Sequence, residues 1–219
     1  LSYKLEGVKD LKLTAEIISD IYLGKITRWD DEKLKAVNPG QTLPNKAITP
    51  VYRSDGSGTT YVFSDYMSKA DSLWNKELGR GKSLTFKYGI IAETDGAIGY
   101  IGSEYTLALG IASAQLKNSA GNFVRATEAS ISASANVSMP DDTRLMITNS
   151  PNPEAYPIST FTWIIAYKEQ AYNNRTAEQA KSLVDLLNYI TDKSGQEIAA
   201  KTHYAPLTGA ALEKTKAAI

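Results

Sequence analysis

The stretch VYRSDGSGTTYVFSDYMS, Val51 to Ser68, decides the fold. An apolar run from Ala47 to Arg53 leads into a turn of Ser, Asp and Gly, and helical spacing of apolar residues resumes at Thr59. The pattern predicts a buried strand, a glycine turn and a helix that runs to Ala70. The first N–H groups of such a helix point outward without intrahelical acceptors, and the helix dipole adds positive charge there. We therefore expect a small oxyanion to bind at this turn.

Two charged residues in the turn suggest how the anion is held. Arg53 offers a planar guanidinium that matches two oxygens of a tetrahedral anion. Asp55 would repel an anion unless it orients Arg53 through an ion pair or accepts a proton that the ligand carries. The remaining candidates are small. Gly56 and Gly58 are expected to adopt positive φ and let the ligand approach the backbone, and hydroxyl donors are expected from Ser57, Thr59 and Thr60.

The residues of the turn allow other interpretations. Ser-Asp-Gly-Ser-Gly also fits an ordinary turn ahead of a helix N-cap. A P-loop requires a lysine after the second glycine, and a nucleophile elbow requires glycine where Asp55 stands. The chain has no cysteine and a single histidine, His203, so it lacks a zinc ligand set. We predict no catalytic residue, no metal, no cofactor and no enzymatic activity, with His203 as a surface or packing residue.

Net charge and the length of the apolar runs limit the kinds of partner that we expect for the chain. The chain has 219 residues, with 24 Lys and Arg against 24 Asp and Glu, so no net field attracts a polyanion and no nucleic-acid partner is expected. Its apolar runs are shorter than the roughly 20 residues of a membrane span. The chain does not begin with Met, and we expect a processed or truncated product whose targeting segment is not shown.

Strands and helices are expected to alternate, which predicts an α/β architecture. Helices are predicted over 13–25, 28–40, 59–70, 103–109, 126–138 and 177–192, with Thr14 as an N-cap and Gly24 as a stop. Strands are predicted over 47–53, 96–102, 111–116, 144–148 and 160–170, and a proline-rich crossover over 148–159. Trp29, Trp74 and Trp163 are expected in the core.

These motifs resemble a known family. RSDGSGTT (53–60), the preceding LKLTAEIISDIYLGKITRWDD (11–31), VNPG (37–40), GAIGYI (96–101) and YPISTFTWII (156–165) closely resemble the substrate-binding protein of bacterial ABC phosphate importers. The resemblance spans nearly the whole chain. It implies a two-lobed periplasmic-binding-protein (type II) fold that closes over inorganic phosphate. It assigns phosphate contacts to Arg53, Ser57, Gly58 and Thr59, with Asp55, Gly56 and Thr60 in support.

The chain departs from the family in two places. The family's N-terminal segment, which carries the opposite half of the phosphate site, has no counterpart before Leu1. The family's glycine-rich segment ahead of Gly96 is short or absent after Ser83. We therefore expect one complete lobe over 1–150, with the anion turn, and a crossover plus the C-terminal part of an incomplete second lobe over 151–219. Open strand edges there invite another chain, and this chain alone is expected to bind phosphate weakly.

The resemblance implies capture of phosphate and its delivery to an ABC transporter permease, at the periplasm or the extracellular face of a bacterial membrane. It leaves open whether the mature protein is lipid-anchored. Two alternatives share the same turn. One is a phosphate-sensing, scaffold or adhesion protein, and the other is a phosphatase-like enzyme, which the lack of a placed nucleophile, base or metal ligand set disfavours.

Overall fold

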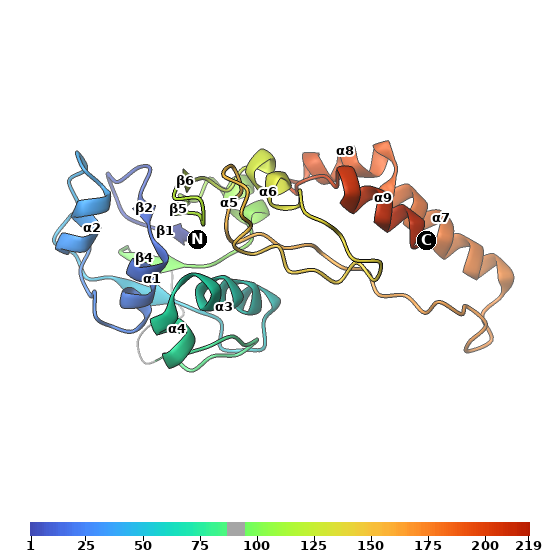
Figure 1. Cartoon of the computed structure of the whole chain (residues 1–219), viewed down its shortest axis with the longest axis horizontal. Coiled ribbons are helices and arrows are strands. Elements are labelled where there is room, and N and C mark those ends of the chain that lie inside the picture. The colour runs from blue at the N-terminus through green and yellow to red at the C-terminus, as the bar shows by residue number, and fades with distance from the viewer. Residues whose placement is uncertain (87–94) are drawn as a thin grey trace.

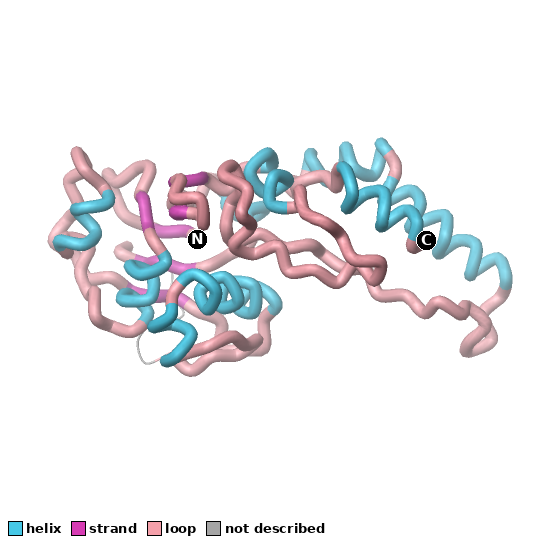
Figure 2. Tube along the Cα trace, viewed as in Figure 1, coloured by secondary structure: helices cyan, strands magenta, loops and turns pink. Residues whose placement is uncertain are grey.

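The computed structural model describes residues 1–86 and 95–219. Two small sheets and the first helices form a body that also contains the N-terminus, and three C-terminal helices extend away from this body at the far end of the molecule (Figure 1). Long stretches without regular structure connect the two parts (Figure 2). The segment after Ser83, where the family's glycine-rich loop is expected to be short, lies partly outside the described residues.

The first sheet carries the strand that leads into the turn. Its order is β1 (Ser2–Tyr3), β4 (Ala97–Gly99) and β3 (Thr49–Val51), with β3 parallel and β1 antiparallel to β4. The register places Val51 opposite Gly99, so the residues after both strands emerge at the same edge of the sheet. The predicted strands over 47–53 and 96–102 are therefore present in shortened form.

The second sheet packs beside the first. It joins β2 (Lys12–Leu13) in parallel to β5 (Gln115–Lys117), and β5 pairs antiparallel with β6 (Phe123–Val124). Backbone hydrogen bonds from Tyr3 to Ala112 and from Ala114 to Leu1 connect β1, an outer strand of the first sheet, to the residues that lead into β5, the central strand of the second sheet.

The first helix has the N-cap and the glycine stop that the sequence predicts. Thr14 caps α1, its hydroxyl accepting from the N–H of Ile17 at 3.3 Å, and Gly24 follows the helix with φ of 72°. Both features confirm the sequence-based expectation. The helices are α1 (Ala15–Tyr22), α2 (Glu32–Val37), α3 (Gly58–Ala70), α4 (Ser72–Glu77), α5 (Ser103–Leu109), α6 (Glu128–Ser134), α7 (Ala177–Thr191), α8 (Lys193–Lys201) and α9 (Gly209–Ala217).

The hydrophobic core belongs to the first part of the chain. Trp29 and Trp74 are fully buried, which confirms their predicted place, and they lie with α1, α3 and the strands in one cluster. Among the described residues beyond Leu116, Tyr156 is the buried member of this cluster, and Val124, Ala126, Ile131 and Ile158 pack against it partly buried. Residues 150–159 still pack on this body, since Asn118 donates to the carbonyls of Pro153 and Ala155 at 2.9 and 3.2 Å.

Two predicted strands are wrong. Residues 144–148 and 160–170 form no ladder in the described part of the chain. Trp163 Nε1 donates to the carbonyl of Thr143, the residue before the first stretch, at 3.2 Å, but the two stretches exchange no backbone hydrogen bonds in the described part of the chain. Trp163 is 42% exposed rather than in the core, and Ile165 is 96% exposed. A strand needs a neighbour to satisfy its backbone, and the apolar pattern alone does not supply one.

The C-terminal helices form a unit of their own. Helix α7 packs against α8 and α9, and Lys214 of α9 forms an ion pair with Asp141. Among the described residues from 160 onward, Thr191 and Ala211 are the buried ones. In the described part of the chain, no helix has both the length and the apolar character that crossing a membrane requires.

Candidate functional site

The predicted turn lies between β3 and α3. Helix α3 begins at Gly58, and Ser57 is its N-cap, with φ of −127° and ψ of 132°. The Ser57 hydroxyl oxygen accepts from the N–H of Thr60 at 3.3 Å, and the Ser57 carbonyl accepts from the N–H of Tyr61 at 3.1 Å. The cap therefore satisfies the later donors of the first turn.

Two N–H groups remain at the start of the helix. The N–H of Ser57 is engaged, because it donates to the carbonyl of Lys82 at 2.8 Å. Those of Gly58 and Thr59 have no acceptor in the described part of the chain, and both residues are exposed. Helix α3 has 13 residues, so its dipole adds partial positive charge at these two donors. The arrangement suits a small anion.

Arg53 and Asp55 form the ion pair that the sequence suggested. The guanidinium donates from Nε to Oδ1 at 2.8 Å and from Nη2 to Oδ2 at 2.7 Å. The two side chains are 53% and 61% exposed. The hydrogen bond from Arg53 holds the pKa of Asp55 below its ordinary value, and the same bond raises the pKa of Arg53. The pair leaves Nη1 and one hydrogen of Nη2 free to donate to a ligand.

The backbone conformation of the two glycines in the turn differs from the expectation. Neither Gly56 nor Gly58 has a positive φ, so the prediction of left-handed backbone at these positions is wrong. A Cβ built on either residue would meet no atom within 4 Å. Both glycines therefore border open space on the exposed side of the turn.

The hydroxyl residues of the turn divide into two kinds. Thr59 is exposed, whereas Ser57 and Thr60 are buried. The Thr60 hydroxyl lies 2.9 Å from the hydroxyl of Tyr100, which also accepts from the N–H of Arg53 at 3.4 Å. Thr60 therefore connects the turn to the protein interior. Tyr100 was missed in the sequence, because only the pairing of β3 with β4 brings it to this edge.

An aromatic cluster lies beneath the turn. The Tyr100 ring stacks on Phe63 with centroids 4.5 Å apart and an interplanar angle of 19°. The ring centroid of Tyr22 lies 5.4 Å from that of Phe63 and 5.9 Å from that of Trp74. The Tyr22 hydroxyl donates to the carbonyl of Val51 at 3.1 Å. Rings packed at these distances attract one another beyond their buried area. The end of β3 and the start of α3 thus rest on one packed floor.

A second polar cluster ties α3 to the crossover. Asp65 is 1% exposed and accepts from Arg80 and Lys69 at 2.8 Å each, and from the hydroxyl of Thr148. Burial alone would raise the pKa of Asp65, but these hydrogen bonds outweigh it and lower the pKa. Since Thr148 is the first residue of the predicted crossover, the carboxylate connects α3 to the start of that segment.

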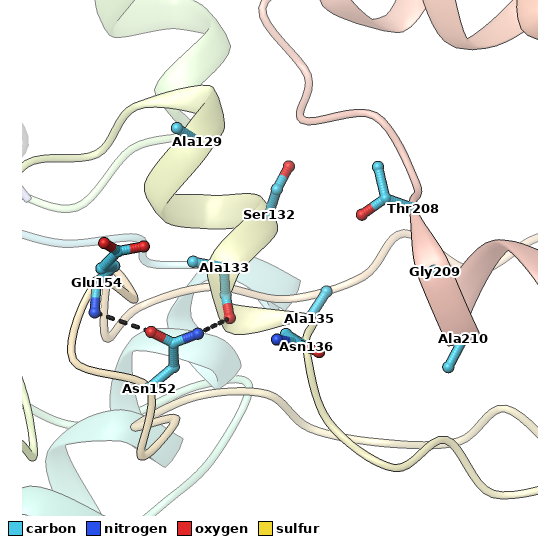
Figure 3. A pocket seen from close by; sticks show the side chains of 10 residues that line it. All are labelled: Ala129, Ser132, Ala133, Ala135, Asn136, Asn152, Glu154, Thr208, Gly209 and Ala210. Atoms are coloured by element: carbon cyan, nitrogen blue, oxygen red, sulfur yellow. Dashed lines mark hydrogen bonds between the residues drawn. The ribbon is translucent and has the colours of Figure 1, made fainter.

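A cavity of about 310 Å³ lies away from the turn, between α6 and the start of α9 (Figure 3). Asn152 donates to the carbonyl of Ala133 at its edge and accepts from the N–H of Glu154. None of the predicted site residues lines it. Its lining contains a carboxylate and no basic side chain, which does not suit an anion. The described residues that line it are Ala129, Ser132, Ala133, Ala135, Asn136, Asn152, Glu154, Thr208, Gly209 and Ala210.

Comparison with known proteins shows the family of the chain. A family model described as the PBP superfamily domain matches residues 2–194. A phosphate-binding protein PstS from Xylella fastidiosa (strain 9a5c) is 34% identical over 211 residues, which cover 90% of this chain and 57% of the relative. The chain thus spans little more than half the length of that protein.

Solved structures share the fold. The ancestral soluble variant of the Human Phosphate Binding Protein aligns with a TM-score of 0.69 at 18% identity, covering 99% of this chain and 68% of that one. A high affinity periplasmic phosphate-binding protein solved with bound phosphate aligns with a TM-score of 0.64 at 17% identity, over 99% and 67% of the two chains.

Proposed function

The chain belongs to the PBP superfamily, and on that premise we propose that it is part of a solute-binding protein that captures inorganic phosphate and delivers it to an ABC transporter permease. One observation carries the proposal. The free N–H groups of Gly58 and Thr59 and the guanidinium of Arg53 lie on the same exposed turn. Three donor groups, two backbone N–H groups and one ionised side chain, are then available to one small anion.

Each residue of the turn has a distinct role in this proposal. Arg53 donates two hydrogen bonds to phosphate oxygens, while Asp55 holds its guanidinium in place. Ser57 accepts from the N–H of Thr60, so its own hydrogen is available to donate. Gly58 and Thr59 donate from the backbone. The hydrogen bonds compensate for the water that phosphate loses on binding.

The protonation state of Asp55 bears on selectivity. The pKa of Asp55 is lowered by the hydrogen bond from Arg53, so at neutral pH the carboxylate accepts hydrogen bonds and does not donate them. An acceptor near the ligand favours phosphate, which keeps a proton at neutral pH, over sulfate, which has none. Asp55 is our second choice for this role, after an acceptor from the opposite lobe.

The cellular location of the protein and its permease partner are also part of the proposal. The relatives are phosphate-binding proteins, which supports a periplasmic or extracellular location and a permease partner, with or without a lipid anchor. We propose that residues 1–150 form the lobe with the anion turn and that residues 151–219 are part of a second lobe. In this proposal, an additional polypeptide segment completes the second lobe. Closure of two such lobes would bury the anion. The role is binding rather than catalysis.

Calorimetric titration tests the function directly. Phosphate is titrated into the 219-residue chain, into Arg53→Gln and into Arg144→Gln. Arg144 is a matched control, because it is exposed and donates to Asp142 from the same atom type, Nε, at 2.9 Å. We expect binding weaker than submicromolar in the unaltered chain, loss of it in Arg53→Gln, and no change in Arg144→Gln. Equal affinities for the two variants would contradict the proposal.

A further inference from the structure

The hydroxyl of Tyr100 joins the two sides of the anion turn. Tyr100 directly follows β4, and β4 pairs with β3 so that Gly99 lies opposite Val51. This register carries the tyrosine to the point where the chain leaves the sheet toward Arg53. Its hydroxyl contacts the N–H of Arg53 at 3.4 Å and the hydroxyl of Thr60 at 2.9 Å. One side chain therefore contacts both the strand end and the helix start.

The chemistry of the groups fixes the direction of one of these hydrogen bonds. A backbone N–H can only donate, so the Tyr100 oxygen accepts from Arg53, whereas either hydroxyl can donate in the contact between Tyr100 and Thr60. The N–H of Thr60 in turn donates to the Ser57 hydroxyl oxygen at 3.3 Å. Hydrogen bonds therefore connect the Arg53 backbone to Tyr100, Tyr100 to the Thr60 side chain, and the Thr60 backbone to Ser57.

The surroundings of Tyr100 keep its hydroxyl in place. Its ring stacks on Phe63, a fully buried residue of α3. Thr60 is also fully buried, so bulk water does not compete for its hydroxyl. Because the ring packs on Phe63 and the hydroxyl is hydrogen-bonded, the Tyr100 side chain has little rotamer freedom.

We propose that Tyr100 is a positioning residue, which holds Arg53 and Ser57 at the separation that the anion requires. The proposal rests on the proposed function for its ligand but not for its geometry. Tyr100 acts through its two partners. Without its hydroxyl, the strand end loses its connection to the helix start, and the donors of the turn must be ordered again each time an anion binds.

Phosphate titration of Tyr100→Phe is the first test. The variant keeps the ring on Phe63 and removes only the hydroxyl. Tyr66→Phe is the matched control, because Tyr66 lies on α3 and its hydroxyl donates to the carbonyl of Lys117 at the same length, 3.4 Å. We expect roughly three- to tenfold weaker phosphate binding in Tyr100→Phe, which corresponds to one net hydrogen bond, and unchanged binding in Tyr66→Phe. Equal affinities would overturn the proposal.

A measurement without ligand separates this proposal from the proposed function. Backbone order parameters of Arg53 and Asp55 are measured by NMR relaxation in phosphate-free solution. We expect values near 0.85 in the unaltered chain and in Tyr66→Phe, and a fall toward roughly 0.6 in Tyr100→Phe. Unchanged values in Tyr100→Phe would refute the positioning role. If the unaltered chain shows no heat with phosphate, the proposed function fails, and the order parameters still decide the role of Tyr100.

The partner of Tyr100 supplies a further check. Thr60→Val removes the hydroxyl at the other end of the 2.9 Å contact and keeps the volume of the side chain. If the two hydroxyls act as a unit, Thr60→Val and the double variant with Tyr100→Phe weaken phosphate binding by the same factor. If instead the losses of affinity in the two single variants multiply in the double variant, the two hydroxyls act independently. That outcome would contradict a role for the contact between them.

Discussion

Arg53 donates two hydrogen bonds to Asp55, two residues further along the chain, and the paired side chains stay more than half exposed on the turn. An exposed ion pair of this kind contributes little to stability, because water and salt screen it. Its value lies in geometry. The carboxylate fixes the plane of the guanidinium, so the remaining donors of Arg53 point in a defined direction before a ligand arrives.

Replacing Arg53 with lysine tests the importance of this plane. Lysine keeps the positive charge but cannot donate to Asp55 and to two ligand oxygens in fixed directions. We expect phosphate affinity in Arg53→Lys to fall by about tenfold or more, as for the loss of one charge-assisted hydrogen bond, measured by calorimetry. Arg144→Lys, which alters a similar exposed pair with Asp142, should bind as the unaltered chain does. Retained affinity in Arg53→Lys would show that charge alone suffices.

Ser57 is the N-cap of α3 and, in the proposed function, a hydroxyl donor to phosphate. Ser57→Ala removes both the cap and the proposed donor. We expect a loss of about 1 kcal/mol in unfolding free energy, by urea denaturation, together with weaker phosphate binding. Thr14→Ala removes a cap of the same 3.3 Å length from α1 and should lower stability alone. If the Thr14 variant loses as much phosphate affinity, the effect of Ser57 is one of folding.

Asp65 should make stability depend on acidity. Its pKa lies below the ordinary value in the folded chain, because the hydrogen bonds from Arg80, Lys69 and Thr148 outweigh the cost of burial. The stabilisation is therefore complete above about pH 4, near the unfolded pKa, and is lost as the pH falls through the lower folded value. Asp65→Asn should lose roughly 1–3 kcal/mol at pH 7 and show a flatter decline in acid, measured by urea midpoints from pH 7 to pH 2.

The control for Asp65 is Asp185 on α7. Asp185 pairs with Lys181 at 2.6 Å, but both side chains are well exposed, at 60% and 75%. Asp185→Asn should change the urea midpoint very little at any pH, since exposed pairs contribute little. Parallel acid profiles for the unaltered chain and Asp65→Asn would show that other carboxylates control the acid response.

The exposed apolar segment 160–170 should make the chain self-associate. Ile165 is 96% exposed and lies in a stretch that forms no ladder in the described residues. Unpaired backbone beside apolar side chains attracts a second strand. Light scattering should show association that increases with protein concentration, and Ile165→Lys should reduce it. Leu109→Lys, at a position that is 69% exposed on α5, should not. Equal effects of the two variants would indicate unspecific hydrophobic contact.

The sequence predicted the helices well because their signals are local. The N-cap at Thr14 and the bounds of α5 were both predicted and are confirmed. Strands depend on partners that lie far away in the chain, and there the prediction was weaker. The two-residue strands β1, β2 and β6 carry too short a pattern to find, and the stretches 144–148 and 160–170 have the pattern without a partner. Trp163 was misplaced for the same reason.

In the candidate site, too, the sequence predicted a contact between neighbouring residues but not a contact between distant ones. The pairing of Arg53 with Asp55 was expected from two neighbouring residues and is present. The positive φ expected at Gly56 and Gly58 is absent, because glycine permits that conformation without requiring it. Tyr100 could not be found from local pattern, since 47 residues separate it from Arg53 and the parallel pairing of β3 with β4 brings them together.

The core that ends at Tyr156 has a consequence for proteolysis. The connection that follows residue 159 is exposed, and it contains Lys168, a cleavage site for trypsin. Brief digestion should therefore cut the chain there first and release α7, α8 and α9. The larger fragment would keep both sheets, the aromatic cluster and the proposed anion turn, so the part of the molecule that carries this turn could be isolated without the C-terminal helices.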